Sequence, residues 1–176
     1  MCGIIGYVGE RQSAKDVVID GLKALEYRGY DSAGIALATD KKIKIFKTTG
    51  RVKGLEIKVP DINAGVGIGH TRWATHGKVC EENAHPHLSF DGKIAIVHNG
   101  VISNARSLKA ELVEKGIPFS SSTDSEIIAH LLALEDCDME KAIENVGKKL
   151  EGATTFLAIK AGEEAIYMRR CGASLA

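Results

Sequence analysis

The sequence carries no excess charge of either sign, because 23 lysines and arginines are matched by 23 aspartates and glutamates. It therefore lacks the overall basic field that attracts nucleic acid or an anionic membrane, and we expect neither as a partner. No apolar run approaches the roughly 18 residues of a membrane-spanning helix, and no basic region followed by an apolar stretch opens the chain. These absences predict a soluble, cytoplasmic protein.

Cysteine is sparse, and no two cysteines lie close together in the sequence. The four residues are Cys2, Cys80, Cys137 and Cys171. This distribution argues against a zinc ribbon, a redox pair or a dense disulfide framework. The histidines are also unsuited to a metal, because no pair has helical ligand spacing together with a carboxylate. We expect no metal and no other cofactor.

The length of 176 residues and the hydrophobic content of 44% suit one globular domain with a layered core. The order of elements predicts an α+β domain with mainly antiparallel sheets. Strand-like runs are expected at 4–8, 34–38, 43–48, 65–69, 94–97, 154–160 and 165–169, and helices at 13–26, 105–115, 124–134 and 138–150, with a short helix or turn inside 50–64. Expected helix caps are Ser13 with Asp16 as a capping box, Asn104, Thr123 or Asp124, and Asp138.

Cys2 follows the initiator methionine, and removal of Met1 would give it both a thiol and a free α-amino group. A thiol with a pKa of about 8.5 is mostly protonated at neutral pH, whereas an α-amine with a pKa of about 7.7 to 8.0 can accept its proton. Cys2 is therefore a candidate nucleophile that carries its own base. The alternative is a structural cysteine beside a buried strand.

The polar stretch from Thr71 to Gly92 is long for a loop in a compact domain, which favours a functional role. Arg72 lies within it, among histidines, hydroxyls and the single tryptophan. Its guanidinium could hold a substrate carboxylate with two hydrogen bonds, or it could form a structural ion pair. For the histidines of this stretch, structural or substrate-orienting roles are favoured over metal binding.

Two further polar groups lie near the ends of apolar runs. Asn99 and Gly100 are expected where a strand ends and a loop begins, and a side-chain amide with a glycine N–H can stabilise a developing oxyanion. Asn-Gly is also a common tight-turn pair. Asp124 is expected at a helix N-terminus, where its carboxylate either caps the helix or binds a substrate ammonium group.

Six segments, in order along the chain, resemble one enzyme family. They read CGIIG at 2–6, YRGYDSAG at 27–34, HTRWATHG at 70–77, NAHPH at 83–87, HNG at 98–100 and TDSE at 123–126. The chain is similar to the glutaminase half, a class II glutamine amidotransferase domain, of the glutamine–fructose-6-phosphate aminotransferases (isomerizing), the glucosamine-6-phosphate synthase family. Tyr30 and Trp73 favour this family over amidophosphoribosyltransferase.

The resemblance implies an N-terminal nucleophile hydrolase fold, which is a four-layer αββα sandwich with antiparallel sheets. It implies hydrolysis of L-glutamine to glutamate and ammonia through a thioester on Cys2. The implied roles are Cys2 as nucleophile, Asn99 and Gly100 as oxyanion hole, Arg72 and Asp124 on the glutamine carboxylate and ammonium, Trp73, Thr75 and His76 in a loop that closes over glutamine, and His85 and Arg28 as supports of the site.

The sequence departs from the family at two places. Residues 77–80 lack the usual Pro-Ser pair, and the chain stops at Ala176 without the further strands and the sugar isomerase domains. The expectation is therefore an amidotransferase domain over 2–176, incomplete at its C-terminus, with side chains such as Leu157, Ile159 or Ile166 more exposed than usual.

The resemblance also implies that fructose 6-phosphate binds only through the missing sugar isomerase half, and that the full-length enzyme is a homodimer. Two alternatives stay open from the sequence. The chain could be the glutaminase domain of another class II amidotransferase, such as amidophosphoribosyltransferase. It could also be a catalytically silent interaction fragment.

Overall fold

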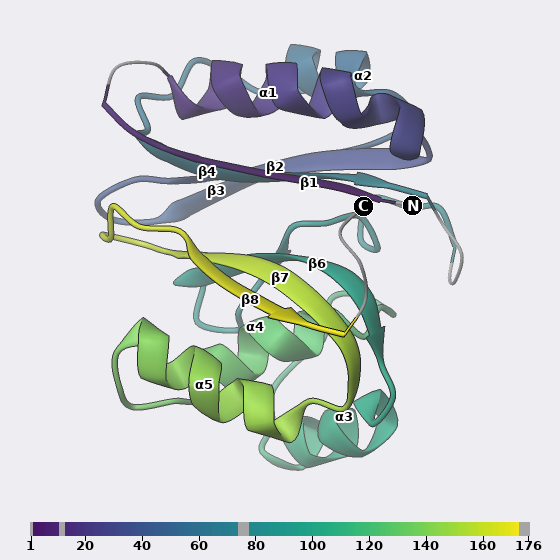
Figure 1. The fold of residues 1–176 in the computed structure, drawn as a ribbon, viewed down its shortest axis with the longest axis vertical. Coiled ribbons are helices and arrows are strands. Elements are labelled where there is room, and N and C mark those ends of the chain that lie inside the picture. The colour runs from purple at the N-terminus through teal and green to yellow at the C-terminus, as the bar shows by residue number, and fades with distance from the viewer. Residues whose placement is uncertain (1, 11–12, 74–77, 173–176) are drawn as a thin grey trace.

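The computed structural model describes residues 2–10, 13–73 and 78–172, and these form two antiparallel sheets stacked face to face with helices on both outer faces (Figure 1). The predicted αββα order of layers is confirmed. Within the described residues, no helix is both long enough and apolar enough to span a membrane.

The first sheet has the strand order β1-β4-β2-β3 and is covered by α1 and α2. A side chain at Gly69 would place its Cβ 2.6 Å from Val18 Cγ1, so the glycine lets α1 lie close against β4. The elements are β1 (Gly3–Val8), α1 (Ala14–Leu25), the 3₁₀ helix η1 (Glu26–Arg28), β2 (Ser32–Ala38), β3 (Ile43–Thr49), α2 (Val52–Lys58) and β4 (Val66–Arg72).

The second sheet has the order β5-β6-β7-β8, and α3, α4 and α5 cover its outer face (Figure 1). Its elements are β5 (His87–Leu88), β6 (Ile94–Ile102), α3 (Ala105–Glu114), α4 (Glu126–Ala133), α5 (Met139–Lys149), β7 (Gly152–Lys160) and β8 (Tyr167–Cys171). Strand β6 is longer than predicted, because β7 pairs with it from Ile94 to Ile102. Asn99 and Gly100 therefore lie inside a strand and not in the loop that the sequence suggested.

The core between the sheets is built from small and β-branched residues such as Ile68 and Val97, both fully buried. The expectation of an exposed Ile159 is wrong, because this side chain points into the same core and is completely buried. Leu157 and Ile166 are half-buried. They pack under β1, where a Cβ on Gly6 would lie 3.1 Å and 3.0 Å from their terminal carbons.

The predicted caps have different outcomes. Asp138 caps α5 by accepting a hydrogen bond from the Lys141 N–H. Ser13 and Asn104 occupy N-cap positions without a side-chain cap bond, so the proposed capping box is wrong. The residue before α4 is Ser125, and Asp124 accepts instead from the Ile102 N–H of β6 at 2.8 Å, a tertiary contact that local sequence could not predict.

Candidate active site

A cleft of about 340 Å³ opens at one end of the sandwich, and its walls come from both sheets and from the loop before α4. This volume lies within the range of small-molecule sites. The cleft is lined by Cys2, His70, Arg72, Trp73, His85, His98, Asn99, Gly100, Val101, Ile102, Ser122, Thr123, Asp124 and Ser125.

The thiol of Cys2 lies at the start of β1 beside the end of β4. The pairing of Gly3 with Thr71 sets this position, and the Gly3 N–H donates to Thr71 Oγ1 at 3.2 Å. The Trp73 N–H donates to Cys2 Sγ at 3.3 Å. The thiol is only partly buried, so a substrate in the cleft can reach it.

Asn99 reaches from β6 of the second sheet to Cys2 at the edge of the first. Its Nδ2 donates to the Cys2 backbone oxygen at 3.1 Å, and its Oδ1 lies 3.1 Å from His70 Nε2. Because a backbone oxygen can only accept, Nδ2 must face Cys2, and the hydrogen on the His70 ring must lie on Nε2. The Asn99 amide is thus held in one orientation, with an N–H group at the cleft.

Gly100 follows in the strand with a φ of +135°, a region that favours glycine. A Cβ at this position would lie 1.8 Å from the Ala153 backbone oxygen of β7. Any residue with a side chain would push β6 away from β7 at this position. Glycine therefore keeps the backbone N–H of residue 100 next to the Asn99 amide.

Arg72 and Asp124 bring opposite charges to the cleft. Arg72 ends β4, is 7% exposed, and donates from Nη1 to the Lys78 backbone oxygen at 3.4 Å. Asp124 is held from β6 through the Ile102 N–H. A cation and an anion on the walls of one cleft suit a zwitterionic amino acid.

The remaining predicted site residues differ in position. Trp73 lines the cleft and packs edge-on against Tyr30, with ring centroids 5.3 Å apart. His85 also lines the cleft, whereas Arg28 lies in η1 and is not among the lining residues. Thr75 and His76 lie outside the described residues.

Four buried histidines gather at the cleft, because His70, His85 and His98 line it and the His87 ring packs against that of His85. The rings of His70 and His85 lie 4.2 Å apart between centroids, and those of His85 and His87 4.7 Å. Burial lowers the pKa of His70 and of His98 to about 4, and it holds the pKa values of His85 and His87 well below 6.5. These rings are neutral near pH 7, and no group of three possible metal ligands occurs among the described residues.

Sequence reasoning gave no role to His98 or Ser125, although both lie in segments that it singled out. His98 Nδ1 and Ser125 Oγ are 2.8 Å apart, and the same hydroxyl donates to Asp124 Oδ1 at 3.4 Å. The available signal was their position in the sequence, because His98 directly precedes Asn99 and Ser125 directly follows Asp124. The contact links β6 to the carboxylate of Asp124.

The model of one protein family, described as "Glutamine amidotransferase domain", matches residues 1–170. The glutamine–fructose-6-phosphate aminotransferases [isomerizing] of Streptomyces coelicolor and Aquifex aeolicus are 51% and 49% identical over 92% and 93% of this chain. The Helicobacter pylori protein of the same name is 44% identical over 99% of it. The chain spans only 27%, 28% and 30% of these three relatives.

Two solved structures have the same fold. One is glutamine phosphoribosylpyrophosphate amidotransferase from B. subtilis, complexed with ADP and GMP, with a TM-score of 0.76 and 29% identity over 91% of this chain and 35% of its own. The other, titled as the allosteric regulatory enzyme of purine biosynthesis, has a TM-score of 0.78 and 30% identity over 90% of this chain and 35% of its own.

Proposed function

This chain belongs to the family of glutamine amidotransferase domains, and on that premise we propose that it hydrolyses the side-chain amide of L-glutamine to glutamate and ammonia. The observation that carries the proposal is the cleft that the Cys2 thiol, the Asn99 amide and the charges of Arg72 and Asp124 share. Together these supply a nucleophile, an oxyanion donor and two groups that recognise an amino acid.

The first chemical step is attack of Cys2 Sγ on the side-chain amide carbon. The carbonyl oxygen becomes an oxyanion, which the Asn99 Nδ2–H and the Gly100 N–H stabilise. The Cys2 carbonyl already orients the Asn99 amide, so the donor does not have to reorganise when charge develops.

The proton of the thiol passes to the leaving nitrogen, and the α-amine of Cys2 carries it once Met1 has been removed. The carbon–nitrogen bond breaks, ammonia leaves and a thioester on Cys2 remains. One water molecule then adds to the thioester, giving glutamate and restoring the thiol. Glutamine and water are consumed, and glutamate and ammonia are formed.

Arg72 and Asp124 hold the substrate in register by binding its α-carboxylate and α-ammonium groups. Both are anchored to the backbone, Arg72 to Lys78 and Asp124 to Ile102. From the family resemblance we also assign Trp73, Thr75 and His76 to glutamine binding, with His85 and Arg28 as supports of the site.

We further propose glucosamine 6-phosphate synthesis as the use of the ammonia, because the similar proteins named above are fructose-6-phosphate aminotransferases. Fructose 6-phosphate would bind to a sugar isomerase half outside these 176 residues, in a homodimer of the full-length enzyme. The same comparisons make an amidophosphoribosyltransferase the weaker candidate, since those structures are 29% and 30% identical.

The test combines ammonia release from glutamine with labelling by an electrophilic glutamine analogue, read by intact mass. Wild type is expected to be active and to gain one label at Cys2 with Met1 absent. Cys2→Ala should lose both activity and label. Cys80→Ala, Cys137→Ala and Cys171→Ala are the matched controls and should retain both, and a label found on Cys171 would overturn the assignment.

A further inference from the structure

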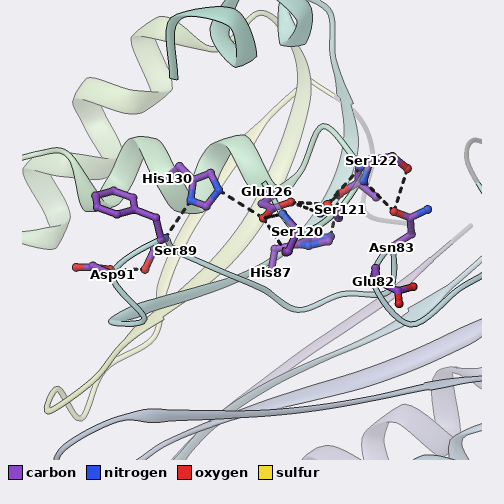
Figure 2. A network of polar contacts seen from close by, with 12 residues as sticks. Glu82, Asn83, His87, Ser89, Asp91, Ser120, Ser121, Ser122, Glu126 and His130 are labelled. Atoms are coloured by element: carbon purple, nitrogen blue, oxygen red, sulfur yellow. Dashed lines mark hydrogen bonds and ion pairs between the residues drawn. The ribbon is translucent and has the colours of Figure 1, made fainter. Parts of the chain in front are cut away.

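The loop before α4, residues 120–125, carries Asp124 to the cleft. Two buried side chains hold it, Glu126 directly after the loop and Asn83 from a distant part of the chain (Figure 2). We name this loop the serine segment. Glu126 fixes its start: Oε1 accepts from the Ser120 N–H and hydroxyl at 2.8 Å each, and Oε2 accepts from the Ser121 N–H and hydroxyl at 2.7 Å and 2.6 Å.

Asn83 fixes the next residue of the serine segment. It is 4% exposed, and its Oδ1 accepts from both the Ser122 N–H and the Ser122 hydroxyl at 3.0 Å (Figure 2). Its Nδ2 donates to the Lys78 backbone oxygen at 3.1 Å. Arg72 Nη1 donates to that same oxygen.

One amide therefore connects the two charged walls of the cleft. On one side it holds the carbonyl that Arg72 contacts, and on the other it holds the backbone two residues before Asp124. We propose that Asn83 is a positioning residue for amino-acid recognition, which fixes the separation of the Arg72 guanidinium and the Asp124 carboxylate. This inference rests on the proposed function, in which these groups bind the carboxylate and the ammonium of glutamine.

The physical reason lies in the groups that Asn83 satisfies. Without its side chain, the Ser122 N–H loses its acceptor in a partly buried place, and the Lys78 oxygen loses a donor. Both loops would then shift toward other partners or water. Ile102 would still hold the Asp124 carboxylate, but the path from Arg72 to the serine segment through Asn83 would be gone.

The experiment measures kcat/KM for amide hydrolysis with three substrates. These are L-glutamine, glutaramate, which lacks the α-ammonium, and γ-aminobutyramide, which lacks the α-carboxylate. In wild type, removing either charged group is expected to lower kcat/KM about 10- to 100-fold, the range that corresponds to a charged hydrogen bond.

The ammonium penalty is the factor by which kcat/KM falls when the substrate lacks the α-ammonium, and the carboxylate penalty is the same factor for the α-carboxylate. In Asn83→Ala, both penalties are expected to fall to about threefold, while kcat/KM for glutamine drops about tenfold as charged contacts weaken. Asn83→Asp keeps an acceptor for Ser122 but cannot donate to the Lys78 oxygen. It should retain the ammonium penalty and lose the carboxylate penalty. Because all substrates are measured on one preparation, a loss of folded protein cancels from these ratios.

Asn104→Ala is the matched control. Asn104 bridges two segments in the same way, donating to the Lys149 oxygen at 2.9 Å and accepting from the Glu151 N–H at 3.1 Å, but it does not line the cleft. Its penalties should equal those of wild type. The inference fails if Asn83→Ala keeps the wild-type penalties while Asp124→Asn loses the ammonium penalty. If Asp124→Asn also keeps that penalty, the proposed recognition by Asp124 fails, and the inference with it.

Discussion

The side-chain nitrogen of Asn99 lies 3.1 Å from the backbone oxygen of Cys2, and this hydrogen bond joins the second sheet to the first at the floor of the cleft. The proposed nucleophile comes from the start of β1 and the proposed oxyanion donor from the middle of β6. Neither sheet alone contains the site. The geometry of the chemistry therefore depends on the packing of the two sheets, which Val97 and Ile159 help to form.

Asn99→Ala is expected to lower kcat for glutamine hydrolysis by about 10² to 10³, with a small effect on KM, because it removes a donor to the developing oxyanion. Steady-state kinetics of ammonia release provide the measurement. Asn145→Ala is a suitable control, since that amide bonds to Glu135 on the far side of the second sheet. A kcat within threefold of wild type would exclude Asn99 from the oxyanion hole.

Arg72→Ala and Asp124→Asn are expected to raise KM for glutamine far more than they lower kcat. Each removes a charged hydrogen bond to the substrate, and the loss is roughly 2 kcal/mol or about 30-fold. Arg170→Ala, on the exposed strand β8, changes the same charge away from the cleft and should be neutral. An unchanged KM in Arg72→Ala would contradict the recognition of the carboxylate by this residue.

Local patterns in the sequence predicted an α+β domain with mainly antiparallel sheets, and the family resemblance predicted its αββα layers. Alternating and continuous apolar runs located the strands that pair as β2 with β3 and as β7 with β8. Cys2, Arg72, Asn99 and Asp124 were found as residue types that suit amide hydrolysis of an amino acid, and they do line one cleft.

What the sequence could not predict are contacts between distant segments. Asp124 reads locally as a cap, but its partner is Ile102 on another element. Asn99 and Gly100 read as a turn, but pairing with β7 extends the strand through them. Asn83 gave no signal of its own, since its importance comes from the two backbones that it connects.

Glu126→Gln is expected to lower the free energy of unfolding by about 2 kcal/mol, because an amide nitrogen cannot accept the hydrogen bonds that one carboxylate oxygen now receives. Burial opposes ionisation of Glu126, yet the His130 ring, whose Nε2 lies 3.4 Å from Oε1, and hydrogen bonds from Ser121 and Ser120 outweigh it and hold its pKa below the usual 4.5. Urea denaturation at pH 7 measures the change.

Glu144→Gln is the control for this prediction. Glu144 lies on the exposed face of α5, its partners among the described residues are Lys141 and Lys148, and such surface pairs contribute little. Its substitution should alter stability by less than about 0.5 kcal/mol. Equal effects of the two substitutions would show that the buried carboxylate does not stabilise the serine segment.

The buried histidines predict that the protein loses stability in mild acid. The pKa of His70 and of His98 is about 4 in the folded chain, because burial disfavours the charged ring, against 6.5 for an ordinary histidine. Between these values the unfolded chain binds more protons than the folded one, so the free energy of unfolding falls as the pH falls. The stabilisation that the two neutral rings contribute to the free energy of unfolding is fully present above pH 6.5 and is lost by about pH 4.

The magnitude for each of these two histidines is about 3 kcal/mol over the whole window, a large part of the 5 to 15 kcal/mol typical of a domain. Urea denaturation at pH 7.5, 6 and 5 should therefore give steadily lower midpoints. His98→Gln cannot titrate, so its unfolding free energy should fall less steeply over this range, even if it is lower at pH 7.5. Parallel pH profiles for wild type and His98→Gln would mean that this ring does not carry the acid sensitivity, and that proton uptake on unfolding occurs elsewhere in the chain.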